Sequence, residues 1–298
     1  MQDFLEHAAK KYYEGEPVLT DEEFDRLASL YNAENVGYQV TDGVPHYFQM
    51  YSLQKFTSKP TLDMLSYAYS PKLDGAAVSL LYVGGELQKA LTRGDGKVGK
   101  DVTNKVKHLV PNTIGLTDTA WVLQITGEVV APISIPNARN YAAGALNLKS
   151  EEEFLERNVN FIAYDTQPAI TTTWTGAMQN LLFLGFATVQ NVQDGVYPTD
   201  GEVYRLDNYK KFQTMGYTAH HPRGAFALKE QKKGVVTQLL DVDWQVGKSG
   251  VVSPVAILSP IKIGDAVVER ATLHNIEYIR GLNPVSYTHL TLPTILPV

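Results

Sequence analysis

Hydrophobic and polar residues form two neighbouring β-like runs in the first third of the chain. Residues 76–82 are apolar and β-prone, residues 86–92 return as a second such run, and Gly84-Gly85 lies between them. A pair of glycines between two runs of this kind is typical of a two-residue β-hairpin turn. The pattern therefore predicts a strand pair that carries Arg93 back towards the residues just before the first strand.

Three helices are predicted from their capping residues. Thr20-Asp21-Glu22-Glu23 is a capping box, and the apolar residues after it share one helical face as far as Tyr31. Ser150 stands before three glutamates in the same way, and Thr173 begins an apolar periodic run that ends near Leu184. We expect a helix at each of these places.

The remaining pattern is that of short strands. They are expected at residues 121–130, 159–164, 201–206 and 225–230, and apolar and polar residues alternate in further short runs after Val235. Such closely spaced runs are typical of a small barrel. The chain is therefore predicted to have an α+β fold of mixed antiparallel sheets and helices, followed by a partial β-barrel.

Composition narrows the class of protein. The 298 residues include 44% hydrophobic side chains, which suits a globular protein with a substantial core. No run is long and apolar enough to span a bilayer, and the N-terminus lacks a signal-peptide pattern, so we expect a cytoplasmic protein without a membrane partner. The chain has no cysteine, which excludes disulfides and thiolate metal ligands within it.

The net charge of −6 gives no general attraction to nucleic acid. Phosphate binding depends on local basic density, however, and a basic group flanks Arg93 in the sequence: Lys97, Lys100, Lys105, Lys107 and His108. A nucleic-acid partner is therefore compatible with the charge.

Two short motifs stand at the two ends of the predicted hairpin: Lys72-Leu73-Asp74-Gly75 and Thr92-Arg93-Gly94-Asp95-Gly96. A lysine among small and apolar neighbours can be partly desolvated, which favours the neutral amine that attacks phosphorus. The glycine-rich turn offers backbone N–H groups and a guanidinium that can hold phosphate. Taken together, the motifs predict covalent nucleotidyl transfer, whereas Lys72 alone is equally compatible with a solvated surface lysine.

These segments resemble those of the NAD-dependent DNA ligases, whose nucleophile reads K-L-D-G and continues through a strand pair into A-T-R-G-D-G. Further matches to the family follow in order: Gly127-Glu128-Val129, Asn137 to Leu146, Asp200 to Val203, Ala227 to Lys229, Trp244 to Gly250 with Ser253 to Ala256, and Ala271 to Asn275. The match from Ala227 to Lys229 resembles the lysine strand that closes the nucleotide pocket, and the matches after it resemble the opening of the family's oligonucleotide-binding (OB) barrel.

The resemblance implies a domain order. Residues 1–48 would be a helical module that binds nicotinamide mononucleotide, residues 49–234 the nucleotidyltransferase (adenylation) domain, and residues 235–284 a partial OB-fold. Residues 285–298 do not continue the barrel pattern and resemble the translation of a transposon-type sequencing adapter. We therefore expect an artefactual tail on a truncated ligase whose native chain is longer.

The resemblance also implies roles for single residues. Lys72 would take AMP from NAD, Asp74 would orient the amine or a ribose hydroxyl, and Arg93 would neutralise phosphate charge. Glu128 would contact the ribose and Lys229 the α-phosphate. Arg139 would face phosphate near a nick.

Metal and further cofactor contacts are implied as well. Asp200, with Glu128 second, would associate with Mg2+. Ser52, Leu53, Gly75 and Arg205 would line the adenylate site. Four residues of the N-terminal module would hold the mononucleotide half of NAD: Tyr12, Tyr13, Asp21 and Asp25.

Several positions depart from the family pattern, among them Ser70 for a glutamate, Asn147 for an arginine and Arg205 for a lysine. Two alternatives stay open: an ATP- or GTP-using nucleotidyltransferase, such as an ATP-dependent ligase or a capping-type enzyme, and an inactive adenylate- or DNA-binding remnant. The helix with Asp21 and Asp25 favours NAD, because it suits a mononucleotide leaving group. We therefore expect a monomer that forms lysine–AMP from NAD and acts on nicked double-stranded DNA.

Overall fold

The computed structural model describes residues 43–60, 63–115, 121–229, 235–246, 252–263 and 266–273, together with the backbone of residues 289–292. The chain forms two compact units, residues 1–230 and 231–298, and each is described by itself. The predicted helix at Thr20 lies outside the described residues, as do the mononucleotide-binding candidates Tyr12, Tyr13, Asp21 and Asp25.

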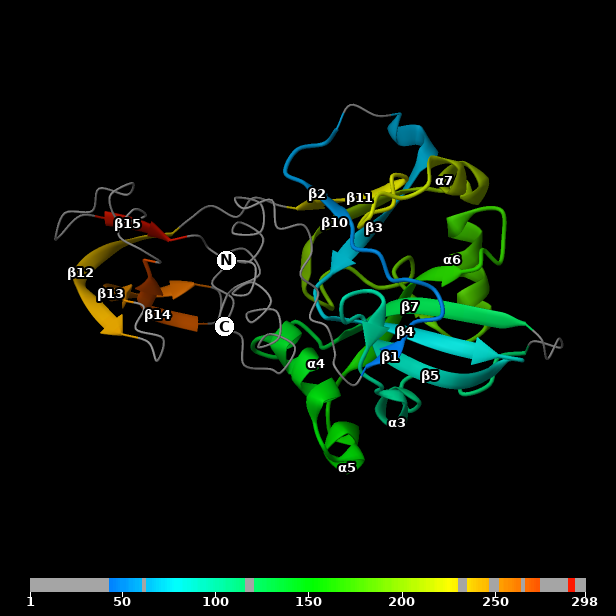
Figure 1. The fold of residues 1–298 in the computed structure, drawn as a ribbon, viewed down its shortest axis with the longest axis horizontal. Helices are drawn as coiled ribbons and strands as arrows, with labels where there is room; N and C mark the ends of the chain where they lie inside the picture. The colour runs from blue at the N-terminus through cyan, green and yellow to red at the C-terminus, as the bar shows by residue number, and fades with distance from the viewer. Residues whose placement is uncertain are drawn as a thin grey trace. The chain divides into compact units, whose positions relative to one another are not determined.

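The predicted hairpin belongs to a five-stranded sheet in the first unit (Figure 1). Its strands, in spatial order, are β5 (Glu86–Thr92), β4 (Ala76–Val83), β7 (Val122–Val130), β8 (Asn160–Gln167) and β9 (Ala187–Thr188). Gly84 and Gly85 have φ values of 58° and 82°, a backbone region that favours glycine. The two-residue turn is therefore confirmed, and it returns the chain to the residues before β4.

A four-stranded sheet carries the lysine motif. Its order is β2 (Gln54–Phe56), β11 (Ala225–Lys229), β10 (Thr199–Leu206) and β3 (Tyr67–Leu73), with β2 parallel to β11 and the other pairs antiparallel. The predictions of β10 and β11 are confirmed. The strand β3 was not predicted, because Pro71 interrupts its pattern; β3 lies at the edge of the sheet, where proline is tolerated.

Helices pack on the five-stranded and the four-stranded sheet of this unit (Figure 1). Among the described residues the helices are α3 (Thr103–Val106), α4 (Ala138–Asn147), α5 (Glu151–Leu155), α6 (Trp174–Phe183) and α7 (Tyr209–Met215), with a 3-10 turn at Met64–Ser66. Two predicted caps are confirmed, because Ser150 accepts a hydrogen bond from Glu153 N and Thr173 from Gly176 N. The helices α3, α4 and α7 were not predicted.

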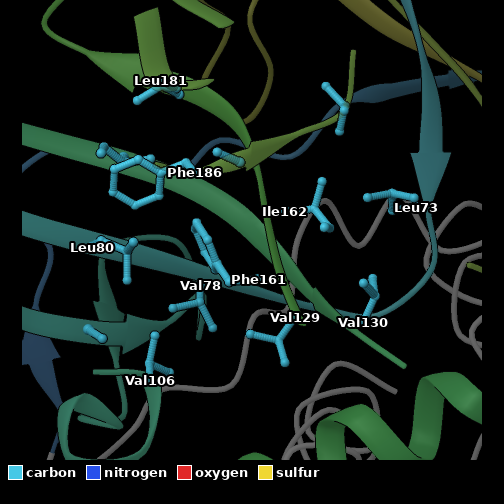
Figure 2. Packing of buried hydrophobic residues seen from close by; sticks show 14 of the residues in the cluster. Leu73, Val78, Leu80, Val106, Val129, Val130, Phe161, Ile162, Leu181 and Phe186 are labelled. Carbon is cyan, nitrogen blue, oxygen red and sulfur yellow. The ribbon is translucent and has the colours of Figure 1, made fainter. Parts of the chain in front are cut away.

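The main core lies between the five-stranded sheet and its helices (Figure 2). Val78 and Leu80 of β4 are fully buried, and they belong to the same cluster as Phe161 of β8 and Phe186, all labelled in Figure 2. Leu73, the last residue of β3, belongs to the same cluster. Burying a leucine contributes about 2 kcal/mol, so this anchor fixes the strand end that carries Lys72.

The second unit is a four-stranded antiparallel sheet in which the last strand, β15 (His289–Leu292), returns to pair with the first, β12 (Val235–Val246). Its order is β14 (Ala266–Thr272), β13 (Val252–Ile263), β12 and β15, all antiparallel. Leu239, Ala256 and Leu258 form its buried centre with Val268 and Leu273. The strand β15 falls within the segment predicted to be an artefactual tail, and that prediction about its origin stays a prediction. Among all described ranges, no helix has the length and apolar character needed to cross a membrane.

Candidate active site

Three neighbouring strands bring Lys72, Asp200 and Lys229 together. Lys72 is the penultimate residue of β3, and its Nζ lies 2.6 Å from Asp200 Oδ1 of β10. The other carboxylate oxygen, Asp200 Oδ2, lies 3.5 Å from Lys229 Nζ at the end of β11. One carboxylate is therefore shared by two predicted phosphate-directed lysines.

A strand irregularity aims Asp200 at the lysines. The pairing of β10 with β3 shifts register between Thr199 and Glu202, which is the local signature of a bulge. Gly201, in this shift, has φ of 147°, and a side chain there would collide with the backbone oxygen of Leu228. Only glycine fits this position, so the backbone conformation that orients Asp200 requires a glycine at position 201.

The Asp200 carboxyl is ionised at neutral pH. Burial alone would raise its pKa, but the nearby Lys72 ammonium lowers it, and Lys229 and Arg139 add to that effect. The resulting pKa lies below the ordinary value of an aspartate. A stable negative charge therefore stands between the two lysines.

Asp74 and Gly75 form the turn that follows the lysine strand. Asp74 Oδ1 lies 3.1 Å from Arg139 Nε, and its backbone N donates to Pro198 O at 2.9 Å. Gly75 lies so close to β7 that a side chain would collide with Val129 O. The turn is thus pressed against β7, and it brings Arg139, from the first turn of α4, into the group.

Glu128 of β7 completes the negative side of this group. Burial raises its pKa to about 7, although the positive charges of Lys72, Arg93 and Arg139 act to lower it and Asp74 acts to raise it. Glu128 therefore lies close enough to these four predicted site residues for their charges to change its pKa. Near neutral pH it is divided between its protonated and ionised forms.

Arg93 projects from a tightly bonded turn after β5. Its backbone N donates to Ala77 O at 3.0 Å, and its carbonyl accepts from Gly96 N at 2.9 Å. The Asp95 carboxylate accepts from Lys97 N and Val98 N, both at 2.8 Å. Gly94 and Gly96 have φ values of 56° and 88°, so the glycines of the motif allow the turn to close.

The other predicted adenylate residues belong to a second group of contacts. Ser52 Oγ donates to His220 O at 3.3 Å and lies 3.1 Å from His221 Nδ1. Leu53 packs against the small core of Leu206, Phe212 and Ala225.

Arg205 lies in this second group rather than beside Lys72. Its Nη1 donates to Asp165 Oδ2 at 2.6 Å, and its guanidinium lies 4.0 Å from the centre of the Phe212 ring. Asp165 was missed by the sequence analysis. The available signal in the sequence was an acidic residue within the mainly apolar run of β8. In the structure Asp165 lies opposite Thr126 of β7.

The first group has the side chains that nucleotide chemistry uses. Its cations, Lys72, Lys229, Arg93 and Arg139, suit phosphate oxygens. Its carboxylates, Asp200, Glu128 and Asp74, suit hydroxyl groups and hard cations. Within the described ranges, no group of three or more acidic, histidine or cysteine side chains is placed to hold a metal ion.

Family comparisons agree with this geometry. Residues 42–136 match the NAD-dependent DNA ligase adenylation domain, and residues 236–290 match the NAD-dependent DNA ligase OB-fold domain. The chain is 28% identical to a DNA ligase of Aquifex aeolicus over 92% of this chain and 49% of that protein. It is 32% identical to a DNA ligase of Pseudomonas fluorescens over 73% of this chain and 33% of that protein. The chain thus spans a third to a half of the length of these relatives.

Among solved structures, the chain is similar to mycobacterial DNA ligase D complexed with ATP and MES. The TM-score is 0.38 at 13% identity, over 78% of this chain and 76% of that one. This likeness is too distant to bear on function. The two domain matches are specific, however, and they follow the order of the two structural units. On the strength of both matches, which cover about half of its residues, the chain belongs to the NAD-dependent DNA ligase family.

Proposed function

We propose that this chain transfers the adenylyl group of NAD to Lys72 and releases nicotinamide mononucleotide. The observation that carries the proposal is the contact of Lys72 with Asp200, and Lys72 lies in the segment, residues 42–136, that matches the ligase adenylation domain. Lys229, Arg93 and Arg139 surround the same place with positive charge, as a phosphate-transfer site requires.

The bond changes are those of a substitution at phosphorus. The Lys72 ammonium first gives up a proton, because a nitrogen engaged as an ammonium has no lone pair to offer. Asp200 Oδ1, 2.6 Å away, holds the Lys72 nitrogen in place, and the proton passes to solvent. The Lys72 nitrogen then forms a bond to the adenylyl phosphorus, the bond from phosphorus to the bridging oxygen breaks, and nicotinamide mononucleotide leaves with the electron pair.

The surrounding residues bind and orient the substrate. Lys229 neutralises the adenylyl phosphate, and Arg93 neutralises charge that develops on the leaving phosphate. Glu128 and Asp74 offer acceptors for ribose hydroxyls or for the lysine ammonium. Ser52, Leu53, Gly75 and Arg205 are assigned to the adenylate site, and Tyr12, Tyr13, Asp21 and Asp25 to the mononucleotide.

We propose Mg2+ as the metal ion of this site. Mg2+ prefers one or two carboxylates supplemented by water and substrate phosphates, and Asp200 and Glu128 offer two hard oxygen ligands beside the phosphate-directed lysines. Asp200 would hold the ion, with Glu128 second. When bound, the ion supplies charge neutralisation at the phosphates.

The whole protein would carry the reaction further. AMP would pass to the 5′-phosphate of nicked double-stranded DNA, with Arg139 facing that phosphate, and the 3′-hydroxyl would then seal the strand during DNA replication and repair. The proposed substrates place the reaction in the cytoplasm, where NAD and DNA occur together. We propose a monomer, because a single chain supplies every described member of the first group.

Intact-protein mass spectrometry tests the proposal. The full chain is first treated with nicotinamide mononucleotide to strip any AMP, then incubated with Mg2+ and either NAD or ATP. An AMP-sized gain with NAD alone is the expected result. Lys72→Ala should abolish the gain, whereas Lys89→Ala, which removes an exposed lysine of β5, should retain it.

The other outcomes contradict the proposal in different ways. A gain with ATP alone would assign the chain to the ATP-using nucleotidyltransferases. A folded protein that gains no mass with either nucleotide would be an inactive remnant.

A further inference from the structure

His46 contacts the turn that carries Arg93, and the mechanism above gives it no role. Its Nε2 lies 3.0 Å from the carbonyl oxygen of Arg93, and its Nδ1 lies 2.8 Å from Ser79 Oγ. The histidine is therefore a bridge between a strand residue and the backbone of a proposed phosphate-binding residue.

The partners determine which ring nitrogen carries the proton. A carbonyl oxygen can only accept, so Nε2 donates to Arg93. Burial lowers the pKa of His46, and this effect exceeds the opposing influence of the Arg93 carbonyl and of Asp95. The ring is therefore neutral at neutral pH, and Nδ1 accepts the hydroxyl hydrogen of Ser79.

Ser79 gives the bridge a rigid base. It lies within β4, only 3% exposed, with Leu91 of β5 on one side and Thr126 of β7 on the other. A ring bonded to this residue is fixed to the five-stranded sheet, and it transmits that fixed position to the Arg93 carbonyl.

The backbone around His46 holds the same turn from outside. The strand β1 (Val44–Pro45) pairs with β6 (Val98–Gly99), and His46 N donates to Lys97 O at 2.9 Å. Met50 N donates to Gly96 O at 2.8 Å. A side chain on Gly99 would collide with Thr92 O and would also come to 3.0 Å from His46 Nε2, so this glycine allows the turn and the imidazole to pack closely.

We infer that His46 is a positioning residue for Arg93, whose carbonyl it holds so that the guanidinium leaves the turn towards Glu128 and Lys72. The inference rests on the proposed function, in which Arg93 neutralises phosphate charge. It adds a residue to that function, since His46 touches no reacting atom and acts through Arg93.

Substitutions whose side chains differ in length test whether His46 acts through its hydrogen bond to the Arg93 carbonyl. A glutamine amide nitrogen extends about as far as Nε2, and an asparagine amide only as far as Nδ1. His46→Gln should therefore keep the bond to Arg93, while His46→Asn and His46→Ala should lose it. The loss of one such hydrogen bond corresponds to a roughly 3- to 10-fold slower adenylation.

The functional test is single-turnover adenylation of the stripped full chain with saturating NAD and Mg2+, followed by intact mass. His46→Ala should be slower by that factor at every pH from about 6 to 9, because Nε2 carries a hydrogen whether or not the ring is protonated. His46→Gln should react within about twofold of the unmodified chain. Thr175→Ala removes a hydrogen bond of 2.7 Å to Asp207 in the same unit and serves as the matched control, with unchanged rate.

A double-mutant cycle shows whether the effect passes through Arg93. In an Arg93→Ala background the guanidinium is gone, so adding His46→Ala should slow the reaction no further. Equal slowing in both backgrounds would overturn the inference. So would unaltered adenylation in His46→Ala, or a His46→Gln protein that is folded yet as slow as His46→Ala, which would instead indicate proton transfer by the imidazole.

Hydrogen exchange at Gly96 separates this inference from the proposed function. The Gly96 amide donates to the Arg93 carbonyl, so it should exchange faster in His46→Ala and at the original rate in His46→Gln. If the unmodified chain gains no AMP, the proposed function fails. The exchange rates alone then test whether His46 positions the turn. Unchanged Gly96 exchange in His46→Ala would overturn the positioning role in either case.

Discussion

Replacing Glu128 with glutamine should stabilise the first unit at alkaline pH while impairing its proposed reaction. Burial raises the pKa of this carboxyl from 4.5 to about 7, so the folded chain keeps a proton that the unfolded chain has lost between those values. Its contribution to the free energy of unfolding is therefore full below pH 4.5 and is lost as the pH rises to about 7. Glutamine has the same shape and no such dependence.

The expected magnitude follows from the shift. At about 1.4 kcal/mol per pKa unit, a rise from 4.5 to about 7 corresponds to about 3.5 kcal/mol as an upper bound. Glu128→Gln should thus match the unmodified chain near pH 4.5 and exceed its free energy of unfolding by up to about 3.5 kcal/mol at pH 8.

Urea denaturation followed by tryptophan fluorescence measures this difference. The chain has three tryptophans, of which Trp121 and Trp174 belong to the first unit, so a Trp244→Phe background restricts the signal to that unit. Glu86→Gln, at an exposed glutamate of β5, is the matched control and should change stability by less than about 0.5 kcal/mol. An advantage of Glu128→Gln that is absent at pH 8, or equal at pH 4.5 and pH 8, would refute the reasoning.

Three further substitutions test other parts of the first unit. Asp200→Asn leaves Lys72 and Lys229 without their shared carboxylate and should slow adenylation at least about 100-fold, measured by intact mass in single turnover. Asp165→Asn breaks a largely buried ion pair with Arg205 and should lower the free energy of unfolding by roughly 2–4 kcal/mol in urea. Gly127→Ala would place a methyl group against the Phe161 ring and should lower the free energy of unfolding by about 2–4 kcal/mol. The control is Gly144→Ala in α4. Its added methyl group meets nothing within 4 Å, and it should raise the free energy of unfolding by up to about 1 kcal/mol.

Local features of the fold could be predicted from the sequence, because they depend on residues close together in the chain. The Gly84-Gly85 turn and the Ser150 and Thr173 caps are of this kind. The helix α7 had an equally local signal, since Asn208 accepts a hydrogen bond from Lys211 N, but it was overlooked.

The candidate site could not be assembled in this way. Lys72 and Asp200 are 128 positions apart, and a register shift in β10 decides that they meet. Only the family resemblance placed them in one site before the fold was known. The ion pair of Arg205 with Asp165 joins two different sheets. Neither the local sequence pattern nor the family resemblance indicated it.

The pairing of β3 with β10 has a consequence for the newborn chain. A ribosome that has just made Lys72 has not yet made the strand that supplies Asp200, and the last strand of that sheet, with Lys229, comes later still. Non-local strand pairing of this kind forms slowly. The nucleophile therefore stays without its partners until nearly the whole first unit has left the exit tunnel, so a nascent chain should be unable to take up AMP before its synthesis has passed residue 229.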